Sequence, residues 1–272
     1  NNWGACFGGS AWEWNEKRGE YYLHCFSVKQ PDLNWENVDV RNAVYEMMRY
    51  WGDKGIDGFR MDVITMISKD QNFPDGVKTG EYGDSSPYTN NGPRIHEFLK
   101  EMNREVISRY DWLTVGEGAG ARVEDTLLYT DPERKELNMI FSFEHMNYNK
   151  PSGENGWIEA PFSLPGYKKI YKKWQEGLSG RGWNTLYLEN HDQTRSVSRY
   201  GDTSTPELWK KSAKALAVMY FLMEGTPYIY MGQELGVTNT DFQDITEFRD
   251  IAALNDWKEL KRSGRSDEEA LH

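Results

Sequence analysis

The segment 57–63 contains a carboxylate that could act as a nucleophile, Asp62, and a cation two residues before it, Arg60. In a β-strand, residues two apart share a face, so these two side chains point the same way. The cationic guanidinium favours the ionised form of the carboxylate, and an ionised carboxylate can act as a nucleophile. The same pattern also suits a buried Arg–Asp pair that braces a sheet.

A second acidic residue, Glu117, follows the apolar segment 112–116 and lies between two glycines. A carboxyl group in such surroundings is often partly desolvated, which raises its pKa and suits it to be a general acid. The alternative is a glutamate in a solvent-exposed loop.

A third acidic position, Asp192, lies in the run Glu189-Asn190-His191-Asp192-Gln193 after another apolar segment. A metal site or a hydrolase triad is poorly supported here, because the sequence lacks the His-x-x-x-His, Cys-x-x-Cys and Gly-x-Ser-x-Gly spacings. A nucleophilic and an acidic carboxyl group together are the arrangement of a glycosidase. The 11 Trp, 16 Tyr and 11 Phe residues agree with it, since sugar rings stack on aromatic faces, although most of them are expected in the core.

A competing motif is Gly116-x-Gly118-x-x-Ala121, which has the outline of a dinucleotide-binding turn between a strand and a helix. The charge of Glu117 inside that turn would face the pyrophosphate, and the helix that follows is short. We therefore favour the glycosidase interpretation.

The elements that must position these residues alternate along the chain. Apolar spacing predicts helices at residues 37–54, 93–107, 123–129, 167–177 and 206–223, and strands at residues 56–64, 112–116, 138–143, 183–188 and 227–231. This order predicts an α/β fold with a parallel sheet, either doubly wound or a (β/α)8 TIM barrel. Polar residues after several different strands favour the barrel, whose enzymes carry their chemistry at the carboxyl ends of the strands.

Composition excludes several classes of protein. The chain has 272 residues and a formal net charge of −11, which argues against nucleic acid as a partner. The longest apolar run, residues 215–223, is too short to cross a bilayer, and no signal peptide is visible. The two cysteines, Cys6 and Cys25, are expected as free thiols in a reducing compartment, with a single disulfide as the alternative. We therefore expect a cytoplasmic protein without a membrane partner.

At these motifs the sequence resembles the α-amylase superfamily, glycoside hydrolase family 13, and within it the oligo-1,6-glucosidase group. The resemblance lies in residues 57–64, 114–117, 189–193, 30–35 and 225–234. It implies barrel strands four to eight in residues 37–232, the end of an inserted loop domain in residues 1–36, and a segment after the eighth strand in residues 233–272. Because strands one to three would then lie upstream, we expect the isolated chain to be inactive.

The resemblance also implies roles for individual residues. Asp62 would be the nucleophile, Glu117 the acid/base, and Asp192 the carboxylate that binds sugar hydroxyls and stabilises the transition state. Arg60 and His191 would contact the sugar in the same subsite. A retaining mechanism would place the carboxyl groups of Asp62 and Glu117 roughly 5–5.5 Å apart.

Specificity depends on neighbouring positions. In this group, Val63 after the nucleophile accompanies a preference for α-1,6 links in isomaltose and its oligomers, and Gln193 is typical of hydrolases. The chain departs from the group at Gly118 and Ala119, where Met-Pro is common, and at Thr194, where Pro is common. These differences concern the shape of the subsite.

Two other functions remain open beside an α-glucosidase: a sucrose isomerase or transglycosylase on the same scaffold, and a non-catalytic relative that serves as a scaffold. The partner would be a small oligosaccharide, and the oligomeric state is not indicated. The resemblance implies no cofactor, and a calcium-binding loop, where the family has one, would lie upstream of residue 1.

Overall fold

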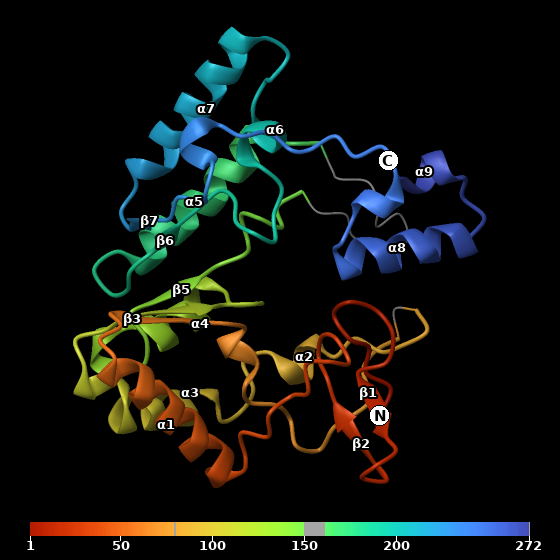
Figure 1. The fold of residues 1–272 in the computed structure, drawn as a ribbon. Coiled ribbons are helices and arrows are strands. Elements are labelled where there is room, and N and C mark those ends of the chain that lie inside the picture. Colours follow the sequence, from red (N-terminus) through yellow and green to blue (C-terminus); the bar gives the residue numbers. More distant parts are fainter. Residues whose placement is uncertain (79, 150–160, 272) are drawn as a thin grey trace. The chain divides into compact units, whose positions relative to one another are not determined.

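The computed structural model describes residues 1–78, 80–149 and 161–271, which group into two compact units (Figure 1). The smaller unit contains residues 1–34, 70–89 and 240–272, and the larger contains residues 35–69 and 90–239. The assignment of residues 1–36, 37–232 and 233–272 to a loop domain, a barrel portion and a following segment stays a prediction.

The larger unit is built on parallel strands. They are β3 (Gly58–Met61), β4 (Leu113–Glu117), β5 (Met139–Phe141), β6 (Thr185–Leu186) and β7 (Thr226–Pro227). Strands β3, β4 and β5 form one sheet, β6 pairs with β7, and a parallel bridge between Ile140 and Asn184 joins the two groups. The spatial order of the described strands therefore follows their order in the chain.

A helix precedes the first strand of this unit, and helices separate the strands that follow. They are α1 (Val38–Asp53), α3 (Ile95–Glu105), α4 (Val123–Thr130), α5 (Leu164–Leu178), α6 (Ser196–Tyr200) and α7 (Pro206–Phe221). Short 3₁₀ helices are η1 (Ile64–Met66), η2 (Ile107–Arg109), η3 (Pro132–Arg134) and η4 (Gln233–Leu235). The α/β alternation and the parallel sheet are confirmed. A doubly wound sheet would need a reversal of strand order, so the sequential order favours the barrel.

The strands are shorter than the apolar patterns predicted. The strand expected at residues 56–64 ends at Met61, because the backbone turns into the left-handed region at Val63 and begins η1. The strand expected at residues 227–231 pairs only through Thr226 and Pro227. The bonds of this pair come from the backbone N–H groups of Thr226 and Tyr228, which donate to the carbonyls of Asn184 and Leu186 at 2.9 and 2.8 Å.

The apolar spacing in α1 runs through Val40, Val44, Met47 or Met48, and Trp51, but the buried face coincides with it only in part. The buried residues are Arg41, Tyr45, Met48 and Gly52, whereas Trp51 is exposed. A Cβ atom at Gly52 would lie 2.4 Å from the Trp112 side chain. The absence of a side chain at Gly52 thus lets the ring of Trp112 pack against the helix, and this contact turns that face inward.

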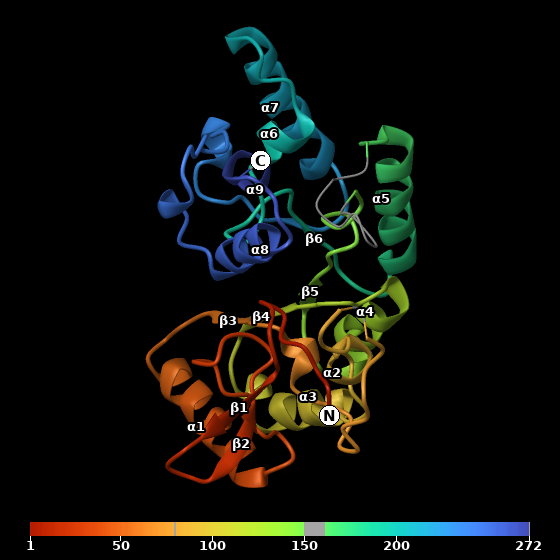
Figure 2. The same cartoon turned by 90° about the vertical axis from the view of Figure 1, so that its right-hand side faces the viewer.

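A separate apolar contact joins α4 and α5, and Figure 2 shows the lower end of α5 next to α4. Val123 of α4 packs with Trp174 and Leu178 of α5, and all three are buried. This contact supports the helix that follows the end of β4.

The smaller unit contains a hairpin of β1 (Trp12–Asn15) and β2 (Glu20–Leu23), with α2 (Ser86–Thr89), α8 (Ile251–Arg262), α9 (Asp267–Leu271) and η5 (Ile245–Glu247). Trp3 is buried and stacks on Tyr88 at 6.0 Å, and its indole N–H donates to the carbonyl of Pro74 at 2.8 Å. Among the described helices of both units, none combines the length and apolar character that a membrane crossing requires.

We predict that Gly58→Ala in the complete protein destabilises the pairing of β3 with β4. Gly58 has φ 150°, and a Cβ atom there would lie 1.8 Å from the carbonyl oxygen of Leu113. The expected loss is roughly 2–4 kcal/mol of unfolding free energy, measured as a lower midpoint of urea unfolding. Gly80→Ala is the control, because nothing lies within 4 Å of its added Cβ. Equal midpoints for the two variants would contradict the prediction.

Candidate active site

Two of the predicted carboxylates meet at one cation, Arg60. The register pairs Arg60 with Val115, so the carboxyl ends of β3 and β4 lie beside each other. The Arg60 Nη1 atom donates to Asp62 Oδ1, and its Nη2 atom donates to Glu117 Oε2 at 2.7 Å. Side chains that the sequence places 55 residues apart are thereby joined through a single guanidinium.

The backbone next to Asp62 is strained in a way that serves this contact. Val63 has φ 34° and ψ 41°, in the left-handed region that a β-branched residue rarely adopts. In this conformation its N–H donates to Glu117 Oε2 at 3.1 Å. Strain of this kind persists only where the surrounding structure enforces it, and it is common at functional sites.

The two carboxyl groups have different surroundings. The Glu117 side chain is 13% exposed, whereas the Asp62 side chain is 72% exposed. Burial raises the pKa of Glu117 above its ordinary value and the charge of Asp62 adds to this, against the lowering effect of the Val63 N–H and of Arg60. The direction agrees with the general acid expected from the sequence, because a raised pKa keeps the proton available near neutral pH.

The third motif places Asp192 beside His191. Asp192 Oδ2 lies 3.2 Å from His191 Nε2, and the Asp192 backbone N–H donates to Asn190 Oδ1 at 2.8 Å. The charge of Asp192 also acts on the buried phenol of Tyr187. Burial raises the pKa of that phenol, and the charges of Glu117 and Asp192 both add to the effect. The charges of both carboxylates thus act on the same phenol.

A cavity of about 400 Å³ opens at the carboxyl ends of the strands. It is lined by Arg60, Val115, Glu117, Phe141, Phe143, Tyr187, Glu189, Asn190, His191, Tyr228, Ile229 and Tyr230. Of the predicted site residues, Arg60, Glu117 and His191 line this cavity. Asp62, Val63, Asp192 and Gln193 are not part of the lining, so the structure brings the predicted set together only in part.

Sequence reasoning did not identify the aromatic wall of this cavity. The Phe141 ring lies 5.4 Å from the Tyr187 ring and 4.7 Å from the Tyr228 ring, measured between centroids. The available signal was spacing: Phe141 and Phe143, like Tyr228 and Tyr230, are two residues apart at the end of a strand. Such pairs point into the same space.

The glycines around Glu117 are needed for packing. A Cβ atom at Gly116 would lie 2.5 Å from the Ile64 side chain, and one at Gly118 would lie 2.7 Å from the carbonyl oxygen of Phe141. Because neighbouring side chains and backbone occupy this space, the glycines admit close strand packing. The dinucleotide interpretation loses its main support, since that motif uses glycines to approach a phosphate.

In the part of the chain that the structure describes, no group of three or more His, Cys, Asp or Glu residues has an arrangement that could hold a metal ion. Cys6 is exposed and Cys25 is buried, and both lie in the smaller unit.

Comparison with known proteins identifies the family. Residues 1–269 match the catalytic domain of alpha amylase. The chain is 55% identical to an oligo-1,6-glucosidase from Parageobacillus thermoglucosidasius over 275 residues, which cover 100% of this chain and 48% of that protein. It is 51% identical to a trehalose-6-phosphate hydrolase from Bacillus subtilis strain 168, covering 98% of this chain and 47% of that protein.

A solved structure shares the fold. The isomaltulose synthase of Klebsiella sp. LX3 superposes with a TM-score of 0.92 at 41% identity, covering 100% of this chain and 48% of the synthase. The chain spans about half the length of each of these relatives, and the observed strands are part of a (β/α)8 barrel. The chain belongs to the α-amylase family and forms part of its catalytic domain.

Proposed function

We propose that this chain supplies the nucleophile and the general acid of a retaining α-glucosidase. The observation that carries the proposal is the Arg60 bridge, which holds an exposed carboxylate and a buried carboxyl group on one cation. The contrast between them is the division of roles that glycoside hydrolysis requires: one carboxylate ionised and one carboxyl group protonated.

In the proposed reaction, the Asp62 carboxylate attacks the anomeric carbon of a terminal glucosyl unit. The bond to the leaving oxygen breaks, and Glu117 transfers its proton to that oxygen. Glu117, now ionised, removes a proton from water, which attacks the same carbon and releases Asp62 with the original anomeric configuration. Asp192 and His191 bind hydroxyl groups of the glucosyl ring, and the aromatic wall offers apolar faces to it.

The substrate that we propose is an α-1,6-linked glucoside such as isomaltose. The support is the 55% identity to an oligo-1,6-glucosidase and the Val63 side chain next to the nucleophile. Likeness to an isomaltulose synthase and to trehalose-6-phosphate hydrolases makes sucrose isomerisation and trehalose 6-phosphate hydrolysis the alternatives to test. A purely structural relative is disfavoured because Asp62, Glu117 and Asp192 are all present.

We also propose that the reaction needs no cofactor and takes place in the cytoplasm. The chemistry above uses only carboxyl groups and water. The cytoplasmic location is supported by the low cysteine content, two in 272 residues, because disulfide-rich chains are typical of oxidising compartments.

The first prediction concerns substrate choice by the complete protein. Initial rates on isomaltose should exceed those on maltose, sucrose and trehalose 6-phosphate, since Val63 shapes the space around the leaving group. The advantage over maltose should be about 10-fold or more, given what a small apolar change in a subsite contributes. Faster cleavage of maltose would rule out the α-1,6 preference, and conversion of sucrose to an isomer would favour the isomerase.

The second prediction concerns the nucleophile. Asp62→Asn in the complete protein should lower kcat by about 10³-fold or more, because the amide cannot form the glycosyl ester. Circular dichroism should be unchanged, since Asp62 is largely exposed. Asp70→Asn, a change outside the proposed machinery, is the control. Wild-type turnover by Asp62→Asn would show that another group is the nucleophile.

The third prediction concerns pH. The activity should fall at alkaline pH as Glu117 loses its proton, and burial places this limb above the ordinary pKa of a glutamate. Arg60 lowers the pKa of Glu117, so Arg60→Gln should move the alkaline limb of kcat/KM to higher pH while reducing its maximum. Arg122→Gln, which removes a guanidinium paired with Asp125, should leave the limb unchanged. A shift to lower pH in Arg60→Gln would contradict the assignment of Glu117 as the acid.

A further inference from the structure

A buried carboxylate at the start of the third motif is held by three donors. Glu189 directly follows the buried residue Leu188, and its side chain is 1% exposed. Its Oε1 atom accepts from Arg195 Nη1 at 2.9 Å, and its Oε2 atom accepts from the Ser196 backbone N–H and from Ser196 Oγ, both at 2.6 Å. Charge-assisted bonds of this kind are strong and fix geometry.

These bonds close the loop that carries His191 and Asp192. The chain leaves Glu189, makes a turn through residues 190–194, and returns to the same carboxylate at Arg195 and Ser196. Inside the turn, Asn190 Oδ1 accepts from the Asp192 N–H at 2.8 Å. The position of Asp192 therefore depends on a loop whose two ends are tied to one side chain.

Arg195 extends the network to the segment after β7. Its Nη1 atom also donates to the carbonyl of Met231 at 2.8 Å, and its guanidinium lies 4.9 Å above the Tyr230 ring. Its backbone N–H donates to Asn239 Oδ1 at 2.7 Å. Because Tyr230 lines the 400 Å³ cavity, one arginine connects the Asp192 loop to the part of the cavity wall that follows β7.

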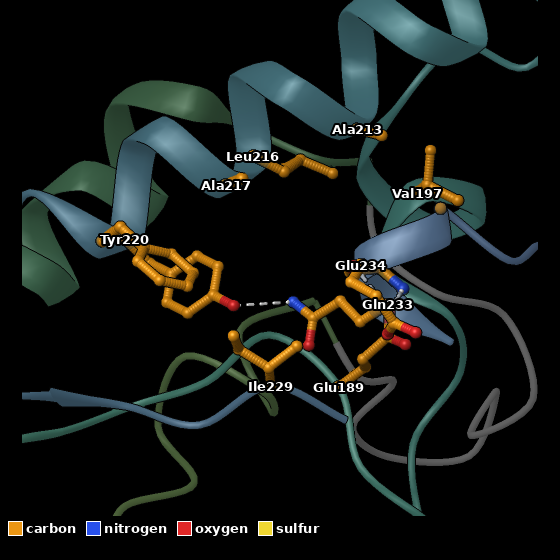
Figure 3. A pocket seen from close by; sticks show the side chains of 12 residues that line it. Glu189, Val197, Ala213, Leu216, Ala217, Tyr220, Ile229, Gln233 and Glu234 are labelled. Atoms are coloured by element: carbon orange, nitrogen blue, oxygen red, sulfur yellow. Dashed lines mark hydrogen bonds between the residues drawn. The ribbon is translucent and has the colours of Figure 1, made fainter. Parts of the chain in front are cut away.

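A second, smaller cavity of about 200 Å³ lies behind Glu189 (Figure 3). Figure 3 shows Glu189 and Ile229 across this space from α7, and both residues also line the larger cavity. Gln233 donates to Tyr220 at 3.1 Å and accepts from the Tyr230 N–H at 3.0 Å. Tyr230 is thus held from both sides, and Glu189 lies in the partition between the two cavities.

We propose that Glu189 and Arg195 are positioning residues that hold the loop with His191 and Asp192 against the sugar subsite. Both Glu189 oxygens are occupied by protein donors, so the carboxylate acts through the loop and does not contact the substrate. This inference rests on the proposed glycosidase function. In glycoside hydrolysis, hydrogen bonds to the sugar hydroxyl next to the reacting carbon strengthen in the transition state. Loss of the pair should therefore weaken the interaction with this hydroxyl.

The test compares two substrates in the complete protein: p-nitrophenyl α-glucoside and its 2-deoxy analogue. Glu189→Gln should lower kcat/KM for the glucoside by about 10- to 100-fold, the cost of a small misplacement. The loss for the 2-deoxy analogue should be less than about threefold, because the affected hydroxyl is already missing. Equal losses on the two substrates would overturn the inference, since a general structural defect affects both.

A matched control is Glu224→Gln. Glu224 accepts from Ser179 Oγ at 3.1 Å but precedes β7, at the opposite edge of the strands from Glu189. This variant should keep the wild-type ratio between the two substrates. If Glu189→Gln does not fold, Ser196→Ala takes its place, because it removes one donor and keeps the backbone N–H bond. The same substrate-dependent loss is then expected, and its absence would overturn the inference.

A double-mutant cycle adds an independent readout. If Glu189 acts through Asp192, the combined variant Glu189→Gln/Asp192→Asn should be hardly slower than Asp192→Asn alone. Additive losses would overturn the inference while leaving the glycosidase function in place. A wild-type protein that cleaves no α-glucoside would instead overturn the proposed function, and this inference with it.

Discussion

The arrangement of the site depends on one cation between two carboxyl groups. Without Arg60, Asp62 and Glu117 would be neighbouring acids with no compensating charge between them, and like charges at short range disfavour joint ionisation. With Arg60 in place, the exposed carboxylate stays paired while the buried carboxyl group keeps a raised pKa. The contrast between nucleophile and acid is therefore a property of three side chains on two strands.

Close backbone packing makes this contact possible. Arg60 reaches Glu117 only because β3 and β4 are parallel neighbours in a register that aligns their carboxyl ends. Gly58 and Gly116 leave room for adjacent atoms that a Cβ would strike. The strained backbone at Val63 then ends β3 and directs an N–H at the same carboxyl group. The two glycines, the strand register and the strained backbone at Val63 all contribute to the contacts of the Glu117 carboxyl group.

In the loop after β6, the two acidic residues differ in how deeply they are buried. Glu189 is buried and accepts hydrogen bonds from three donors, whereas Asp192 is exposed beside His191. Both are carboxylates in the same short run of sequence. Burial distinguishes Glu189, which fixes the loop within the protein, from Asp192, which is free to bind a sugar. The periodicity of the sequence does not reveal this difference.

The sequence by itself determined the α/β alternation, the parallel sheet and the strand ends at which the acidic residues stand, because apolar periodicity and local spacing are properties of short segments. It also indicated the raised pKa of Glu117. Only the tertiary structure decided which face of α1 is buried, where each strand stops, and that Arg60 bridges two motifs. It alone showed the aromatic wall and the Glu189 anchor. These features arise from contacts between residues far apart in the chain, and a contact such as that of Gly52 with Trp112 has no signature in either segment alone.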